Sequence, residues 1–363
     1  MKVTKMKTTP LAVPRDLPSL SPTTGEIVSM IYPVLVQLTT DEGLEGWGIC
    51  FTHNKKQVSA LKACVDDLEE VVIGQDVTRF TEAWQKLWNA SGHMGHQGYG
   101  IYAVAAIDSA IWMLRAKALN MSLANCLGGF REKVPSYASQ SLWRNWTIDL
   151  LQKDAADMVK QGFKAMKMRM GDKPFKVEVE RYKAVREAVG PNIDIMVDLN
   201  WSKTTYDAIQ LGRMLEGLGV YWWEDPLASD DPEQIAQVAA ALDMPVVVGE
   251  TFNHKYGFRT LFEKKSADIV MIDLERVGGV TEWIRVANMA NAFNIPVASH
   301  LFPDFSLHLV ASIPNGVWME YMPWFDKLYK EMYKIKDGYM EVPKAPGIGL
   351  ELDPAAIKKY TMK

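Results

Sequence analysis

The chain has 363 residues, of which 48% are hydrophobic and 23% charged, and this composition is typical of a globular protein with a sizeable core. Its formal net charge of −4 excludes the basic excess with which proteins bind nucleic acid. Three cysteines outside any CxxC spacing predict neither a disulfide framework nor a zinc knuckle. Without an apolar signal-peptide core or a run of about 18 apolar residues, we expect a cytoplasmic protein with no membrane span.

Residues 1–130 are predicted to form an α+β unit. β-forming residues over 27–50, interrupted by turn residues at Asp41–Gly46, predict a hairpin. Helical spacing of apolar residues follows over 58–72, 79–90 and 102–119. The Gly- and His-containing stretch 91–100 is interpreted as a loop that starts a helix, because no strand precedes it as a phosphate-binding loop would require. Leu127-Gly128-Gly129-Phe130 predicts a helix stop and a domain boundary.

After Val134 the pattern changes to short apolar runs that alternate with helical segments, as in βαβ units. From Asp198 onward the ends of these runs fall 20 to 27 residues apart, which is the length of one strand, one helix and their loops. Eight such strands predict a closed β/α barrel, whose active site lies at the C-terminal ends of its strands. The predicted strand ends are near Ser139, Arg169, Asn200, Glu224, Glu250, Asp273, His300 and Glu320.

Three carboxylates end three consecutive strands: Asp198, Glu224 and Glu250. Because adjacent strands lie about 4.8 Å apart, their side chains are expected to converge. Three neighbouring carboxylates cannot all stay ionised unless a cation lies among them. Oxygen ligands with open positions for water and substrate favour Mg²⁺. The alternative is three unrelated solvated acids at loop starts.

The next two strands end in Asp273 and His300. A carboxylate on one imidazole nitrogen fixes the tautomer and leaves the other nitrogen for proton transfer. His300 is therefore predicted to be a general base or acid that Asp273 orients. Lys167 and Arg169, two residues apart on the second strand, point to the same side and would flank a substrate opposite His300. Their proximity is expected to depress the pKa of the lysine.

These residues belong to an ordered set of motifs that spans nearly the whole barrel. The motifs are Lys167-Met168-Arg169, Asp198-Leu199-Asn200, Trp223-Glu224-Asp225-Pro226, Gly249-Glu250, Asp273 with Val277-Gly278-Gly279-Val280, Ser299-His300-Leu301-Phe302, and Glu320. With them the chain resembles the enolase superfamily, and specifically its mandelate racemase subgroup.

The resemblance implies an α/β fold, a modified (β/α)₇β TIM-type barrel with an N-terminal α+β capping domain. The cap would comprise residues 1–130 and be completed by the C-terminal segment 331–363, and the barrel would comprise 131–330. Cap loops around Ser19–Glu26 and Thr52–Lys56 would close over the substrate. Relatives of this kind form dimers or octamers, so the resemblance also implies a homo-oligomer.

The resemblance further implies one Mg²⁺ per subunit, held by Asp198, Glu224 and Glu250 together with a small-molecule carboxylate substrate. The enzyme would remove the proton α to that carboxylate, with Glu320 donating a hydrogen bond to the enediolate. Strong electrostatic stabilisation is what makes so weak an acid reactive. Contacts to the substrate are expected from Asn200, Lys167 and Ser139.

One departure from the racemase pattern decides the predicted reaction. Where that pattern has Lys-x-Lys, this chain has Lys167 and then Arg169, and arginine is a poor base because it stays protonated. We therefore expect a one-base lyase of carbohydrate catabolism, an acid-sugar dehydratase in which His300 removes the proton and water then leaves. The alternatives are a racemase or epimerase of a 2-hydroxy acid, with Lys167 or an unusual Arg169 opposite His300, and a catalytically silent carboxylate-binding paralogue.

Overall fold

The N-terminal region of the computed structural model, which describes residues 1–21 and 25–362, begins with an antiparallel sheet. Its strands are β1 (Val3–Pro10), β2 (Val13–Leu20), β3 (Ile27–Thr40) and β4 (Glu45–Thr52). The long strand β3 pairs with all three others, so the predicted hairpin over 27–50 is confirmed. The first two strands were not predicted, because β1 alternates polar residues with few apolar ones.

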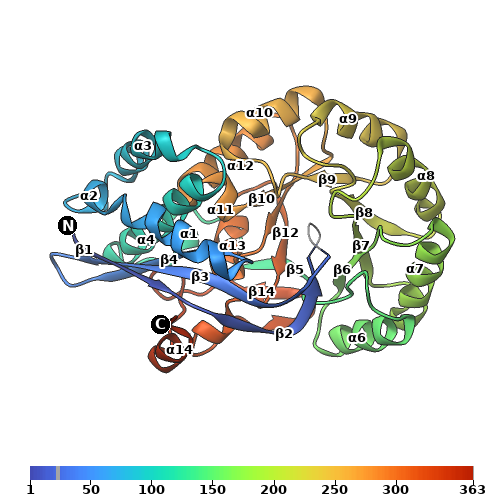
Figure 1. Cartoon of the computed structure of the whole chain (residues 1–363), viewed down its shortest axis with the longest axis horizontal. Helices are drawn as coiled ribbons and strands as arrows, with labels where there is room; N and C mark the ends of the chain where they lie inside the picture. Colours follow the sequence, from blue (N-terminus) through green and yellow to red (C-terminus); the bar gives the residue numbers. More distant parts are fainter. Residues whose placement is uncertain (22–24, 363) are drawn as a thin grey trace.

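Helices α1 (Val58–Asp66) and α4 (Tyr99–Ala118) cover one face of this sheet (Figure 1). The other helices of this region are η1 (Lys55–Gln57), α2 (Glu69–Val72), α3 (Phe80–Ala90), η2 (Ser91–Met94) and α5 (Leu123–Cys126). The single helix predicted over 58–72 is thus divided into two. Helix α4 packs directly on β4, because a Cβ atom at Gly48 would lie 2.0 Å from the carbonyl oxygen of Ala106, and only glycine permits that approach.

Eight parallel strands form the closed barrel on the right of Figure 1, and β12 pairs with β5 to complete it. They are β5 (Lys133–Ala138), β6 (Ala165–Arg169), β7 (Asp194–Asp198), β8 (Val220–Glu224), β9 (Val246–Val248), β10 (Ile269–Asp273), β11 (Val297–His300) and β12 (Gly316–Tyr321). Seven crossovers join them through α6 (Ile148–Lys160), α7 (Phe175–Val189), α8 (Thr205–Glu216), α9 (Pro232–Ala241), α10 (His254–Lys264), α11 (Leu274–Val277) with α12 (Val280–Ala292), and α13 (Pro303–Ser312). The predicted (β/α)₇β barrel with an α+β cap is confirmed.

The barrel interior is a packed core and not a channel. Its inward-facing side chains include Tyr137, Met196, Trp222 and Met271, all buried. This filling closes the barrel beneath the C-terminal ends of the strands. Polar side chains at those ends therefore sit on a solid, water-excluding base.

The C-terminal segment returns to both halves of the molecule. It contains η3 (Asp326–Leu328), β13 (Ile335–Lys336), β14 (Tyr339–Glu341) and α14 (Pro354–Tyr360). Strand β14 pairs with β5, and a bridge joins Leu11 to Thr361. The exact domain boundaries at residues 130 and 330 stay a prediction. In the described part of the chain, no helix is both long and apolar enough to cross a membrane.

Candidate active site

A cavity of about 630 Å³ lies between the C-terminal ends of the barrel strands and the cap. The barrel contributes Lys167, Arg169, Asp198, Glu250, Arg276 and His300 to its lining. The cap contributes Arg15, Ser19, Glu26, His53, Lys55 and Lys56. The cap segments predicted to face the substrate, Ser19–Glu26 and Thr52–Lys56, thus border this cavity, although residues 22–24 of the first lie outside the described residues.

Lys167 lies at the centre of the barrel's acidic side chains. Its Nζ is 2.5 Å from Glu224 Oε1, 3.0 Å from Glu320 Oε1 and 3.5 Å from Asp198 Oδ2, and its side chain is 1% exposed. Burial disfavours the ammonium, but Glu224 and Glu320 outweigh burial and raise the lysine's pKa well above its ordinary value. The expected depression of this pKa by Arg169 is therefore wrong, because three carboxylates lie within 3.5 Å of Nζ.

Asp198 is held on both oxygens by the next loop. The backbone N–H of Asn200 donates to Oδ1 at 2.8 Å, and Asn200 Nδ2 donates to Oδ2 at 3.0 Å. Asn200 has φ 44° and Trp201 has φ 59°, in the left-handed region that asparagine tolerates and tryptophan does not favour. A further positive φ occurs after β8, at Asp225 (41°). Such strain is typical of functional sites that the surrounding structure fixes in place.

Arg169 makes its hydrogen bonds to the end of β5 and the loop that follows it. Its guanidinium donates to the carbonyl oxygens of Ser139 (2.9 Å) and Ser141 (3.1 Å) and to Ser139 Oγ (2.8 Å). The Trp143 ring lies under it at 3.9 Å, and Asp198 Oδ2 is 3.8 Å from its Nε. The group is a fixed cation. Ser139 is fully buried beneath it, so its hydroxyl orients the guanidinium.

His300 and Asp273 form the predicted dyad. Nδ1 of His300 donates to Asp273 Oδ2 at 2.6 Å, and Nε2 lies 3.0 Å from Glu250 Oε2. Burial opposes the charged imidazole, but Glu250, Glu320 and Asp273 raise the pKa of His300 to about 10. In this arrangement Glu250 holds the proton on Nε2, the nitrogen that the dyad leaves for chemistry.

Glu320 closes the inner end of the site. Its Oε2 accepts the backbone N–H of Leu301 at 2.7 Å and lies 3.9 Å from His300 Nε2. Although burial opposes ionisation, Lys167 and His300 lower the pKa of Glu320 to about 2. The carboxyl is therefore ionised here, and it could donate a hydrogen bond only after Lys167 moves away from it.

The three predicted metal ligands are buried oxygen donors, as Mg²⁺ requires. Burial raises the pKa of Glu224 to about 8 in spite of Lys167, so this carboxylate is under-compensated and a divalent cation would stabilise its charged form. Each ligand is turned to a cation of the protein: Asp198 and Glu224 to Lys167, and Glu250 to His300 and Arg276. Within the described ranges no three acidic, histidine or cysteine side chains are already grouped to hold a metal. These residue types, at these strand ends, fit Mg²⁺. In the structure, however, their carboxylates point to the cations of the protein.

Three residues of this site were not singled out from the sequence, and a fourth, Asp225, was named only within a motif and given no role. Arg276, on α11, donates to the carbonyl oxygen of Glu250 at 2.9 Å. Asp225 is buried and accepts from Trp201 Nε1 at 2.8 Å. Arg15 and His53 come from the cap. A strand-end motif signals Asp225, but the other three reach the cavity only through tertiary packing.

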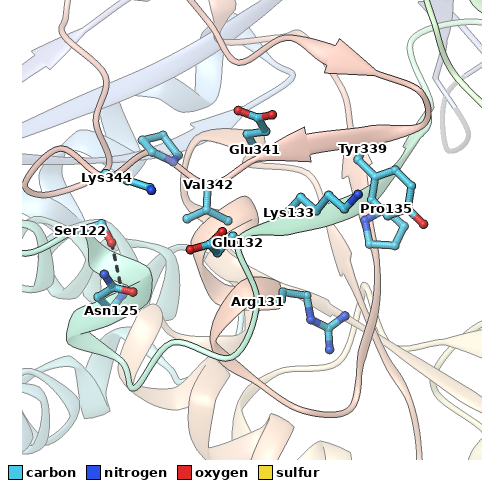
Figure 2. Close-up of a pocket in the computed structure, with 11 residues that line it drawn as sticks. Ser122, Asn125, Arg131, Glu132, Lys133, Pro135, Tyr339, Glu341, Val342 and Lys344 are labelled. Carbon is cyan, nitrogen blue, oxygen red and sulfur yellow. Dashed lines mark hydrogen bonds between the residues drawn. The ribbon is translucent and has the colours of Figure 1, made fainter.

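A second, larger hollow of about 920 Å³ lies beside β5 and β14, at the opposite end of the barrel. Figure 2 shows its charged side chains Arg131, Glu132, Lys133, Glu341 and Lys344 around an open groove. Arg131 donates to the backbone carbonyls of Gly316 and Ile313, so its charge serves the fold.

Comparison with known proteins agrees with this geometry. Residues 8–128 match the mandelate racemase / muconate lactonizing enzyme N-terminal domain, and residues 150–356 match the enolase C-terminal domain-like family. D-galactarolactone cycloisomerase of Agrobacterium fabrum is 30% identical, and arabinonate dehydratase of Saccharolobus solfataricus 28%, each over 91% of both chains. The crystal structure of L-talarate dehydratase from Polaromonas sp. JS666, complexed with Mg and L-glucarate, has a TM-score of 0.92 at 28% identity, covering 100% of this chain and 98% of that one.

Proposed function

The chain belongs to the enolase superfamily, in its mandelate racemase and muconate lactonizing enzyme subgroup, and on that premise we propose that it is a Mg²⁺-dependent acid-sugar dehydratase, a lyase. The acid-sugar dehydratases among its relatives, one of them solved with Mg, support this proposal. Assembly as a homo-oligomer and a cytoplasmic location stay predictions from the sequence.

Asp198, Glu224 and Glu250 are the proposed ligands of Mg²⁺. When bound, the ion would neutralise their charges and polarise the substrate's carboxylate, which acidifies the α-proton. Lys167 and Arg276 contact these acids from either side and offset part of their charge.

His300 is the proposed base. Asp273 fixes its tautomer through the 2.6 Å bond to Nδ1, so Nε2 is the atom that takes the α-proton, after the proton that Glu250 holds there has left. The electron pair of the C–H bond then enters the enediolate. Lys167 Nζ is an N–H donor for one enediolate oxygen, and Glu320 can donate to the same region once it takes up a proton. A charge that develops next to fixed donors in a water-poor site is stabilised far more than in water.

Collapse of the enediolate expels the β-hydroxyl. The proton on His300 Nε2 passes to that oxygen, the C–O bond breaks, and water leaves. The enol that remains becomes a 2-keto-3-deoxy acid. One imidazole thus serves as base and then as acid, and the step needs no group on the opposite face.

The observation that carries dehydration over racemisation is the position of Arg169. Racemisation needs a second base opposite His300, and the guanidinium there is bound to Ser139, Ser141 and the Trp143 ring. Lys167 could supply that base only by giving up its proton between Glu224 and Glu320. The racemase is therefore the second candidate.

Incubation with Mg²⁺ and a panel of acid sugars in D₂O tests the proposal. Dehydration yields a 2-keto-3-deoxy acid from at least one member, whereas a racemase places deuterium at the α-carbon of both epimers. A protein that only binds carboxylates yields neither product. His300→Asn is the matched inactive control, and full turnover by that variant would exclude the one-base mechanism.

A further inference from the structure

One cation in the cavity, Arg15 on β2, has no carboxylate of the protein as a partner among the described residues. Its guanidinium donates to Ser19 Oγ and, at 2.9 Å, to His53 Nδ1, and it lies 4.0 Å from the centre of the Trp324 ring. Its Nε has no hydrogen-bond partner within the same described ranges. All three contacts are neutral, so none of them compensates the charge.

The other buried cations of the cavity differ from Arg15 in this respect. Lys167 has three carboxylates within 3.5 Å, and Arg276 has Glu250 at 3.4 Å. Arg169 has Asp198 at 3.8 Å. For Arg15, burial and then the positive charge of Arg169 lower the pKa to about 9. The guanidiniums of Arg15 and Arg169 thus face one cavity, and that of Arg15 has no counterion among the described residues. This arrangement indicates that the cavity binds an anion from outside the chain next to Arg15.

His53 supplies a second donor at the same place. Because an arginine can only donate, Nδ1 of His53 must accept from Arg15, and the ring proton is then on Nε2. Withdrawal from bulk water, with the positive charges of Arg15 and Arg276, lowers the pKa of His53 to about 3. The imidazole is therefore a neutral N–H donor at physiological pH. Its ring packs edge-on against Phe51 and Trp324, which fixes its direction.

We propose that Arg15 and His53 form a distal subsite for a second carboxylate, so that the substrate is a dicarboxylic (aldaric) acid sugar. One carboxylate would lie over the barrel acids near His300, and the other would meet the guanidinium that the cap brings to the same cavity. Arginine matches a carboxylate with two parallel hydrogen bonds. A monocarboxylic sugar presents a neutral hydroxymethyl group there and leaves the Arg15 charge unpaired. This inference rests on the proposed function.

Kinetics with a matched pair of substrates, galactarate and galactonate, measure the subsite directly. For the wild type, kcat/KM is expected to favour the diacid by at least about 10-fold, and Arg15→Gln is expected to lower the diacid-to-monoacid ratio by about 10- to 100-fold, mainly through KM. Arg15→Lys, which keeps the charge but loses the planar fork, should fall in between. Arg213→Gln, an exposed arginine on α8, matches the change in net charge and should leave the ratio unaltered.

Calorimetric binding separates failure of the subsite from failure of the proposed function. His300→Asn enzyme with Mg²⁺ should bind galactarate more tightly than galactonate, and the double variant with Arg15→Gln should lose that preference. If no acid sugar is turned over but the binding preference is present, the reaction is wrong and the subsite stands. If turnover occurs with equal preference, or if Arg15→Gln leaves the ratio unchanged, the subsite is wrong. Should Arg15→Gln fail to fold, His53→Ala provides the same comparison.

Discussion

The floor and the roof of the active-site cavity differ in whether their cations are paired with carboxylates. On the floor, formed by the barrel strand ends, each cation meets carboxylates: Lys167 lies among three and Arg276 contacts Glu250. On the roof, formed by the cap, the contacts that Arg15 makes with described residues are all with neutral groups. A floor with internally paired charges can perform one reaction on any suitable carboxylate. An unpaired cation on the roof then decides which carboxylate fits.

Removal of metal should have the largest effect, and it should act on the floor. Treatment with a chelator is expected to lower turnover by about 10⁴-fold or to background, because several kcal/mol of charge stabilisation are lost and each 1.36 kcal/mol is tenfold in rate. Added Mg²⁺ should restore activity. Unchanged turnover in the chelated protein would contradict the assignment of the three carboxylates as ligands.

His300→Asn tests the same floor with all three proposed ligands kept, although it removes the 3.0 Å contact between Nε2 and Glu250. The loss of the base should lower kcat by about 10²- to 10⁴-fold. Circular dichroism and the melting temperature should change little, since Asp273 keeps its other hydrogen bond, from the backbone N–H of Arg276 at 2.7 Å. Steady-state kinetics with Mg²⁺ in excess measure the effect, and a loss of less than 10-fold would assign the proton transfer to another group.

The joint between cap and barrel should make stability depend on pH. Asp108 of α4 accepts from the backbone N–H and hydroxyl of Thr281 on α12, and burial raises the pKa of Asp108 from 3.8 to about 7. The folded state therefore binds more protons than the unfolded state over this range, and stability falls as pH rises from about 4 to about 7. Denaturant unfolding should be measured for the wild type and for Asp108→Asn. Relative to the variant, the free energy of unfolding of the wild type should fall by on the order of 2–4 kcal/mol between about pH 4 and pH 7. A difference between the two unfolding free energies that does not change with pH would contradict a protonated, buried Asp108.

Substitutions of Glu275 should have the smallest effect, and they test one hydrogen bond that holds the cap to the barrel. Its buried carboxyl accepts the backbone N–H of Phe51 at 2.6 Å, two residues before His53. Burial and Asp273 raise the pKa of Glu275 well above its ordinary value, so glutamine imitates the protonated group. Glu275→Gln should be nearly neutral, whereas Glu275→Ala should cost about 1–3 kcal/mol by leaving the N–H without a partner. Equal unfolding free energies for the two variants would contradict this link.

The floor could be predicted from the sequence because strand ends fall in a regular rhythm and parallel strands place those ends together. Asp198, Glu224, Asp273 and His300 are each the last residue of a strand. The pKa of Lys167 was predicted in the wrong direction, because spacing revealed Arg169 as a neighbour but did not show that Glu224 and Glu320 reach Nζ.

The two cap segments Ser19–Glu26 and Thr52–Lys56 were predicted to face the substrate, but Arg15 and the role of His53 were not, because these side chains reach the cavity through long-range packing. Arg15 lies on β2, a strand without a recognisable apolar pattern, whose pairing with β3 brings the arginine to the barrel. His53 follows β4 and carries no motif of its own. The packing of the cap against Glu275 and Trp324 helps to place both residues.

The most direct test of the central claim is proton NMR of the reaction in D₂O, with both the product and the remaining substrate analysed. A floor with His300 on one face and a fixed Arg169 on the other predicts a 2-keto-3-deoxy acid deuterated at C3, and remaining substrate with a single configuration at the α-carbon. Accumulation of the α-epimer with deuterium in both configurations, and no dehydrated product, would contradict the one-base account.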